Sequence, residues 1–309
     1  MKALFSTFKK IILFLMYLSI TIFFSSSCKK DPKIQQTKIV TIPTISGNWI
    51  TTSYTGYPCG KLIVKDSTIF AGNGNICKSM DNGNSWTTFN ISGEAGDCFL
   101  INGTNIFSGG GNEGYPTLWL SVNNGTTWTQ QLISGIDGTF IETLAKLGNN
   151  IFSITTSSLF LSTNNGTNWT QSINGLPANT FAHSLVVKDS NIFAGTTKGV
   201  YLFNQQTSNW TSVSNGLPSD ANVSSLAVEG NNIYAGTMNY YGIYLSNDNG
   251  NNWIAVNNGI PVDPNGGAYS LISSITISGT YIFANVRGSI YLSTDNGSNW
   301  LLITGLPLY

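Results

Sequence analysis

One eight-residue phrase recurs along this chain of 309 residues and constrains the fold more than any other feature. Its first full copy, Ser79 to Trp86, reads Ser-Met-Asp-Asn-Gly-Asn-Ser-Trp. The copies end in tryptophans at positions 86, 128, 169, 210, 253 and 300, which are 42, 41, 41, 43 and 47 residues apart. The copy that ends at Trp210 is degraded and keeps only the tryptophan. Repetition at a nearly fixed period of this length predicts an array of equivalent structural units.

Each unit contains four short apolar segments that are separated by Gly and Asn. In one unit they are 184–187, 192–195, 199–202 and the segment that begins at Trp210. Short strands joined by such turns are typical of all-β proteins, and four strands in about 42 residues match one propeller blade. We therefore predict an all-β fold: a β-propeller of about six four-stranded antiparallel blades over residues 47–309. A ring of seven blades is the alternative, because residues 46–51 look like a lone fourth strand.

The repeated phrase has its own turn mechanics. Asn-Gly between two strands predicts a tight hairpin, since both turn residues need a positive φ. The preceding Asp can accept hydrogen bonds from the turn's own amides, and the Trp is expected to enter the fourth strand and pack into the sheet. Two copies carry Asn123 and Asn164 in place of Asp, which a catalytic acid could not tolerate. The residues to which we assign this structural role are Asp81, Gly83, Trp86, Gly125, Trp128, Gly166, Trp169, Asp248, Gly250, Trp253, Asp295, Gly297 and Trp300.

The pattern Ser-x-Asp-x-Gly-x-x-Trp resembles the Asp-box, or bacterial neuraminidase (BNR) repeat. That repeat occurs in sialidases, sortilin-type receptors, xyloglucanases and a photosystem II assembly factor. The resemblance covers residues 60–309 approximately and implies a sialidase-like propeller with Asp-box turns between the third and fourth strands. It is specific for the fold and weak for function, because unrelated activities share one scaffold.

The N-terminus has the features of a targeting segment. Residues 1–27 combine three lysines, an uncharged stretch at 11–24 and a Ser-rich end before Cys28, which is the pattern of a signal peptide rather than a membrane span. Ser-Ser-Ser-Cys resembles the lipobox of Bacteroidetes-type lipoproteins, which implies cleavage before Cys28 and lipid attachment to it. Residues 28–46 are then a tether. We expect a lipid-anchored protein of the cell envelope, at the outer membrane or cell surface, that touches the membrane only through its anchor.

Charge and cysteine content narrow the partners. Charged residues make up 9% of the chain and Arg287 is its one arginine, so no basic stripe can neutralise nucleic-acid phosphates. Removal of residues 1–27 leaves 11 Lys+Arg against 14 Asp+Glu, a net charge of −3. In an oxidising compartment two of Cys59, Cys77 and Cys98 are expected to pair as a structural staple, and the sequence does not choose the pair. We expect a monomer.

A ligand site is expected on the face that carries the loops between second and third strands (b–c) and between blades (d–a). Loops on a rigid scaffold commonly bind ligands, and the repeated phrases occupy the opposite face. This loop face carries Glu94, Asp97, Asp137, Asp220 and Lys198. The ligand-binding candidates are Glu113, Tyr115, Tyr240, Tyr241, Asp263 and Arg287, and the expected ligand is a glycan or a surface protein.

Catalysis is the less favoured hypothesis. Sialidase-type sites hold the substrate carboxylate with three arginines, whereas this chain has one. The single histidine, His183, is interpreted as a packed residue, and no metal-ligand cluster or cofactor motif is present. A glycoside hydrolase stays open as an alternative, because it needs only two suitably spaced loop-face carboxyls. An assembly factor for a membrane complex is a third hypothesis.

Overall fold

A computed structural model describes residues 61–303 apart from 73, 90, 92–94 and 263–268. The predicted signal peptide, the lipid site at Cys28, the tether, Cys59 and the strand-like segment 46–51 lie outside the described residues. Within them the chain forms six antiparallel sheets of four strands, each paired in chain order. This confirms the predicted all-β propeller of six blades. The described part of the chain contains no helix long and apolar enough to span a membrane.

The first three blades follow the first three repeats. Blade 1 contains β1 (Lys61–Lys65), β2 (Thr68–Gly72), β3 (Ile76–Ser79) and β4 (Thr87–Phe89). Blade 2 contains β5 (Cys98–Asn102), β6 (Asn105–Asn112), β7 (Tyr115–Ser121) and β8 (Thr129–Gln130). Blade 3 contains β9 (Ile141–Leu147), β10 (Asn150–Thr155), β11 (Leu159–Ser162) and β12 (Thr170–Gln171).

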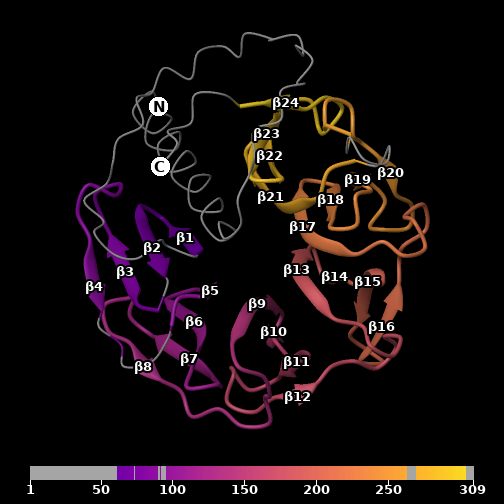
Figure 1. Ribbon diagram of the computed structural model, residues 1–309. Coiled ribbons are helices and arrows are strands. Elements are labelled where there is room, and N and C mark those ends of the chain that lie inside the picture. The colour runs from indigo at the N-terminus through magenta and orange to yellow at the C-terminus, as the bar shows by residue number, and fades with distance from the viewer. Residues whose placement is uncertain (1–60, 73, 90, 92–94, 263–268, 304–309) are drawn as a thin grey trace.

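The last three blades repeat the plan. Blade 4 contains β13 (Ala182–Lys188), β14 (Asn191–Thr196), β15 (Gly199–Asn204) and β16 (Asn209–Ser212). Blade 5 contains β17 (Val223–Glu229), β18 (Asn232–Thr237), β19 (Ile243–Ser246) and β20 (Ile254–Ala255). Blade 6 contains β21 (Ile272–Ser278), β22 (Tyr281–Val286), β23 (Ser289–Ser293) and β24 (Leu301–Leu302). Figure 1 shows the blades following one another around a ring, with the first strand of each innermost and the fourth outermost.

The hydrophobic core lies between blades rather than inside one. Each large buried cluster draws on two neighbouring blades: one joins Phe107 and Leu118 of blade 2 to Phe160 and Trp169 of blade 3. Similar clusters join blade 3 to blade 4, blade 4 to blade 5 and blade 5 to blade 6. Both faces of an interior blade are therefore covered, which explains why the strands are apolar on both faces rather than alternating.

The turn in each repeated phrase has the expected geometry. In blade 5, Asn249 and Gly250 have φ values of 60° and 84°. The Ser246 hydroxyl donates to Asp248 Oδ1 at 2.8 Å and accepts from the Gly250 amide at 2.8 Å. Asp248 Oδ1 also accepts from the Asn252 amide at 2.9 Å. Where Asn123 replaces Asp, its Oδ1 accepts from the Thr127 amide at the same 2.9 Å, so the turn needs an acceptor oxygen and not a charge.

The sequence predicts that each tryptophan packs into its own sheet. In the structure the tryptophans also contact the preceding blade. The Trp253 backbone amide donates to the Asn215 carbonyl in the loop of the preceding blade at 2.9 Å, and its indole Nε1 donates to the Val213 carbonyl at 2.7 Å. Trp169, Trp210 and Trp300 make the equivalent amide bond to the preceding blade at 2.8 Å. The repeated phrase therefore joins one blade to the previous one as well as turning its own hairpin.

Two of the three remaining cysteines are described, and both are buried free thiols. The Cys77 sulfur lies 3.4 Å from the Thr88 hydroxyl, and the Cys98 thiol donates to the Ile141 carbonyl at 3.4 Å. The expected structural disulfide is therefore absent between these two residues, because each sulfur is packed into a different inter-strand contact.

Candidate functional site

The loop face gathers exposed aromatic side chains. Tyr115, Phe140, Phe181 and Tyr240 are 74%, 37%, 51% and 42% exposed, and they come from the b–c turns or blade-entry loops of blades 2, 3, 4 and 5. We call these four residues the aromatic row. The fifth exposed aromatic of the described residues, Tyr281, follows the β21–β22 turn on the opposite face. Exposed aromatics grouped on one face are typical of binding surfaces.

Two predicted positions, one acidic and one tyrosine, meet where blade 4 leads into blade 5. The Tyr241 hydroxyl donates to Asp220 Oδ1 at 2.8 Å. The Asn239 side-chain amide donates to the Asp220 carbonyl at 2.6 Å, and its Oδ1 accepts from the Asn222 amide at 3.1 Å. The hydrogen bond to Asp220 raises the pKa of Tyr241, because it favours the neutral phenol. These bonds fix the b–c loop of blade 5 against the preceding blade-entry loop.

Arg287 extends this group into blade 6. Its guanidinium lies 5.9 Å from the centroid of the Tyr240 ring, which is cation–π geometry. Tyr240 and Arg287 both have positive φ, at 68° and 50°, and such strained backbone is common in loops that present side chains for binding. From below, buried Asn257 accepts from the Ile243 amide and donates to the Tyr241 carbonyl at 3.2 Å. Blades 5 and 6 and the loop before blade 5 thus hold Asp220, Tyr240, Tyr241 and Arg287 together, and we call these four residues the Arg287 group.

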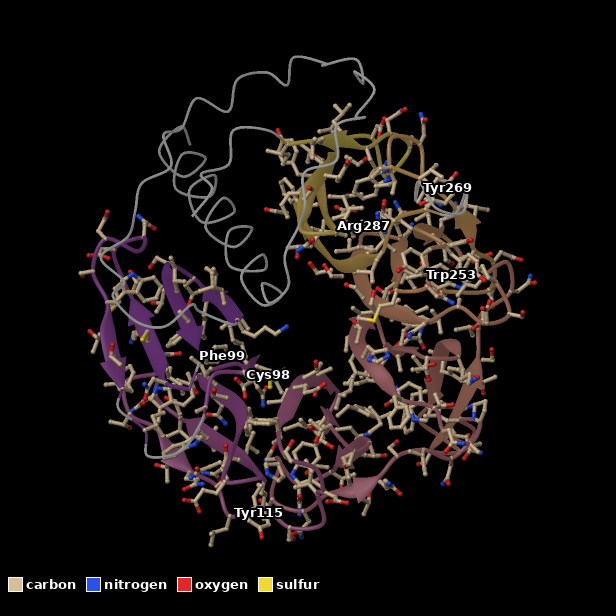
Figure 2. The ribbon with its side chains drawn as sticks, viewed as in Figure 1. Cys98, Phe99, Tyr115, Trp253, Tyr269 and Arg287 are labelled. Atoms are coloured by element: carbon tan, nitrogen blue, oxygen red, sulfur yellow. The ribbon has the colours of Figure 1, made fainter. Side chains whose placement is uncertain are left out.

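The structure separates the remaining candidates from that group. Glu113 and Gly114 form the two-residue turn between β6 and β7, and Tyr115 follows them in blade 2. In Figure 2, Tyr115 and Arg287 lie on opposite sides of the ring. Asp263 and Glu94 lie outside the described residues. Lys198 is exposed on a b–c turn, and Asp137 accepts a hydrogen bond from the Gly138 amide next to it. The predicted candidates therefore form two regions and not one.

Four inner strands each contain a β-bulge near their start, and each bulge adds one polar residue to the inner strand. The register with the second strand shifts at this point in β9, β13, β17 and β21. Bulges re-aim side chains and are common beside functional sites. The extra residues are Glu142, His183, Ser224 and Ser273. His183 is half-buried beside Asn222; burial lowers the pKa of His183, and the Asn222 side chain partly offsets this.

A small pocket that the sequence did not reveal opens on the inner strands of blades 1, 2 and 3. Its volume is about 170 Å³, and it is lined by Lys61, Leu62, Ile63, Cys98, Phe99, Glu142, Thr143 and Leu144. Figure 2 shows Cys98 and Phe99 on the inner side of the ring. Only the spacing of the repeats could have indicated it, because it combines one strand from each of three repeats. We call it the inner pocket.

The titratable groups of the inner pocket have distinct environments. Burial raises the pKa of the Cys98 thiol to about 12, so the thiol stays protonated and is a poor nucleophile and metal ligand. Burial also raises the pKa of Glu142, and the positive charge of Lys61 partly offsets this. No group of three or more His, Cys, Asp or Glu side chains suited to a metal ion occurs among the described residues.

Comparison with known proteins identifies the fold and no family. No family description matches the chain, and no curated protein matches it. Solved structures do: YCF48 bound to D1 peptide has a TM-score of 0.57 at 14% identity, over 80% of this chain and 82% of that chain. The Niastella koreensis GH74 enzyme has a TM-score of 0.60 at 18% identity, over 76% of this chain and 44% of that chain. An ancestral GH74 enzyme gives 0.61 at 15% identity, over 82% of this chain and 41% of that chain. At such identities the likeness is one of scaffold alone.

Proposed function

We propose that this chain is a non-catalytic, surface-exposed lipoprotein of the Asp-box type, lipid-anchored at Cys28, whose loop face binds a glycan or a protein. The observation that carries the proposal is the aromatic row, with one exposed ring from each of four successive blades on one face. Large rigid side chains contribute contact area at low cost in conformational entropy, and they dominate binding energy at interfaces.

The Arg287 group gives this face polar specificity. Its members combine a guanidinium, two phenols and a carboxylate: Tyr241 donates to Asp220 in the loop before blade 5, and Arg287 of blade 6 lies over the Tyr240 ring. Arginine and tyrosine are the residue types most enriched at binding hot spots. The peptide bound to the YCF48 propeller supports a protein ligand as one of the two classes, and a glycan suits the same mixture of aromatic faces and hydrogen-bonding groups.

The test is a glycan array, with cross-linking mass spectrometry of envelope proteins, using the soluble chain from residue 29. Alanine at Tyr115, Phe181 or Tyr240 should each weaken a demonstrated interaction by about 1 kcal/mol or more. Tyr281→Ala is the matched control, because Tyr281 is 40% exposed, close to the 42% of Tyr240, and lies on the opposite face. If Tyr281→Ala weakens binding as much as the three loop-face changes, the assignment of the loop face is wrong.

Glycoside hydrolysis is the second candidate, and one observation favours it. Asp97 directly precedes β5 and Glu142 lies in β9, and the negative charges of both raise the pKa of the Cys98 thiol, so both carboxyls lie in the neighbourhood of Cys98. The raised pKa of Glu142 suits a general acid. Sugar release from a glycan library that disappears in both Asp97→Asn and Glu142→Gln would establish this function and overturn the non-catalytic proposal.

A further inference from the structure

The side of blade 6 that faces away from blade 5 carries buried apolar side chains. Ile282 and Ala284 of β22 belong to the core cluster that blade 6 shares with blade 5. Side chains alternate between the two faces of a strand, so Phe283 between them, and Ile290 and Leu292 on β23, point the other way. These three are only 6%, 2% and 1% exposed. In Figure 1 the described strands of blade 1 stand apart from those of blade 6, so the question is which part of the molecule covers this face.

In the preceding blades, the same positions are covered by the tryptophan of the next blade. Phe193 and Val200 of blade 4 share a core cluster with Trp253 of blade 5. The equivalent sets are Tyr234 and Ile243 with Trp300, Phe107 and Leu118 with Trp169, and Phe152 and Leu159 with Trp210. Phe283 and Ile290 occupy the matching positions in the register of blade 6. Their environment therefore predicts a further tryptophan on this face.

Blade 6 also repeats the backbone acceptor that such a tryptophan uses. The indole Nε1 of Trp300 donates to the Val256 carbonyl at 2.7 Å. Val256 follows the fourth strand of blade 5, and its own amide donates to the Ile243 carbonyl at 2.9 Å. In blade 6 the Ile303 amide donates to the Ile290 carbonyl in the same way, at 2.8 Å. The Ile303 carbonyl therefore has the position of an indole acceptor.

Trp49 is the tryptophan whose sequence fits this position. Asn48-Trp49-Ile50 repeats the Asn-Trp-Ile of 252–254, where Trp253 covers blade 4. Trp49 also stands twelve positions before Lys61, the first residue of β1, just as Trp86 stands twelve positions before Cys98, the first residue of β5. This length of chain assigns residues 46–51 to the unit before blade 1, which in a ring is the place after blade 6.

We propose that residues 46–51 dock on blade 6 and close the ring: the Trp49 ring covers Phe283 and Ile290, and its indole N–H donates to the Ile303 carbonyl. In every blade the chain enters its fourth strand from the face of the repeated phrases, because the third strand ends there. The tether that precedes Trp49 therefore leaves on that face, and the aromatic row points away from the anchor. This orientation rests on the proposed function, whereas the docking itself does not.

Methyl NMR on the whole chain, with labelled isoleucine δ1 methyl groups, tests the contact directly. A nuclear Overhauser cross-peak from an indole to the Ile290 methyl is expected, and its loss in Trp49→Phe assigns it to Trp49. Trp49→Phe should also shift the Ile290 methyl signal and leave Ile243 unchanged, because Ile243 lies against Trp300. The cross-peak of the unsubstituted chain remains a test even if a variant does not fold.

Hydrogen exchange measures what the docking contributes. Trp49→Ala should accelerate amide exchange in residues 282–292 at least about tenfold, because the covering side chain is lost, and should change residues 233–246 of blade 5 little. Ile39→Ala, an apolar substitution in the tether, is the matched control and should change neither region.

Two results would overturn the proposal. An Ile290 methyl that responds to Trp86→Phe and not to Trp49→Phe would mean that blade 1 closes the ring directly. A cross-peak that appears only between differently labelled copies would assign the covering tryptophan to a second chain. Neither result bears on ligand binding by the aromatic row, so failure of this proposal is distinguishable from failure of the proposed function.

Discussion

The carbonyl oxygen of Asn215 accepts a 2.9 Å hydrogen bond from the backbone amide of Trp253, 38 residues later in the next blade. The adjacent Gly216 has a φ of 92°, and a Cβ built on it would lie 2.2 Å from the Trp253 carbonyl oxygen. Gly135, Gly175 and Gly259 meet the carbonyls of Trp169, Trp210 and Trp300 in the same way. This contact repeats at each of the four successive junctions from blade 2 to blade 6, so it is a principal connection between neighbouring blades.

Gly216→Ala should therefore destabilise the protein by about 2 kcal/mol or more, since it combines a left-handed backbone with a backbone clash. Thermal unfolding followed by circular dichroism measures this. Gly230→Ala is the control: Gly230 also has a positive φ, 54°, but a Cβ there meets nothing within 4 Å. Equal losses in the two variants would mean that backbone strain alone matters and that the contact with Trp253 contributes nothing.

Asn257→Ala should loosen the Arg287 group although it changes none of the four side chains of that group. The Asn257 side chain satisfies the buried Ile243 amide, and loss of such a partner costs about 1–3 kcal/mol. Because Asn257 also holds the Tyr241 carbonyl, hydrogen exchange should accelerate in residues 238–243. Asn257→Asp retains an acceptor oxygen and should preserve protection of the Ile243 amide. Protection that falls equally in both variants would contradict this role.

Asp248 should tolerate Asn and not Ala. The pKa of Asp248 is lowered by hydrogen bonds from the Asn252 side chain, the Asn252 amide and the Ser246 hydroxyl. A lowered folded-state pKa contributes stability that is present above the unfolded value of about 3.9 and is lost as pH falls through the folded value. Asp248→Ala should therefore lower the melting temperature at neutral pH, and by less in strong acid. Asp248→Asn should stay near the wild type, as the natural Asn123 turn suggests.

Glu142 should show the opposite pH dependence. Its folded-state pKa is raised by burial, so its contribution to stability is present below the unfolded pKa of about 4.3 and is lost as pH rises through the folded pKa. Glu142→Gln should raise the melting temperature slightly at neutral pH and change nothing in strong acid. Lys61→Met should raise the pKa of Glu142 further, as NMR titration of the side-chain carboxyl would show. A lower pKa in Lys61→Met would disprove the coupling between the two groups.

The sequence identified the blades because their signals are local. The Asn-Gly turns, the acceptor at Asp248 or Asn123 and the four apolar segments of each repeat depend on residues within one hairpin. The sequence also contained a signal that the prediction did not use: Asn-Gly-Leu-Pro at 174–177 and at 215–218 marks the loops that join each blade to the next tryptophan. Tyr240, Tyr241 and Arg287 could be predicted to share one face, because hairpin connectivity alone assigns loops to a face.

Tertiary structure decided which of those loops meet and what the inner strands present. Tyr115 and Arg287 belong to the same face but lie across the ring from one another, since angular position depends on how blades twist and stack. The β-bulge that redirects Glu142 and the meeting of β1, β5 and β9 around the inner pocket depend on contacts between residues about one repeat apart or more. The sequence by itself therefore determined the repeating unit, the turns within it and the number of units, because these follow from local propensity. The packing of one unit on the next decided where charged and aromatic groups come together, because that packing sums weak contacts over whole blade faces.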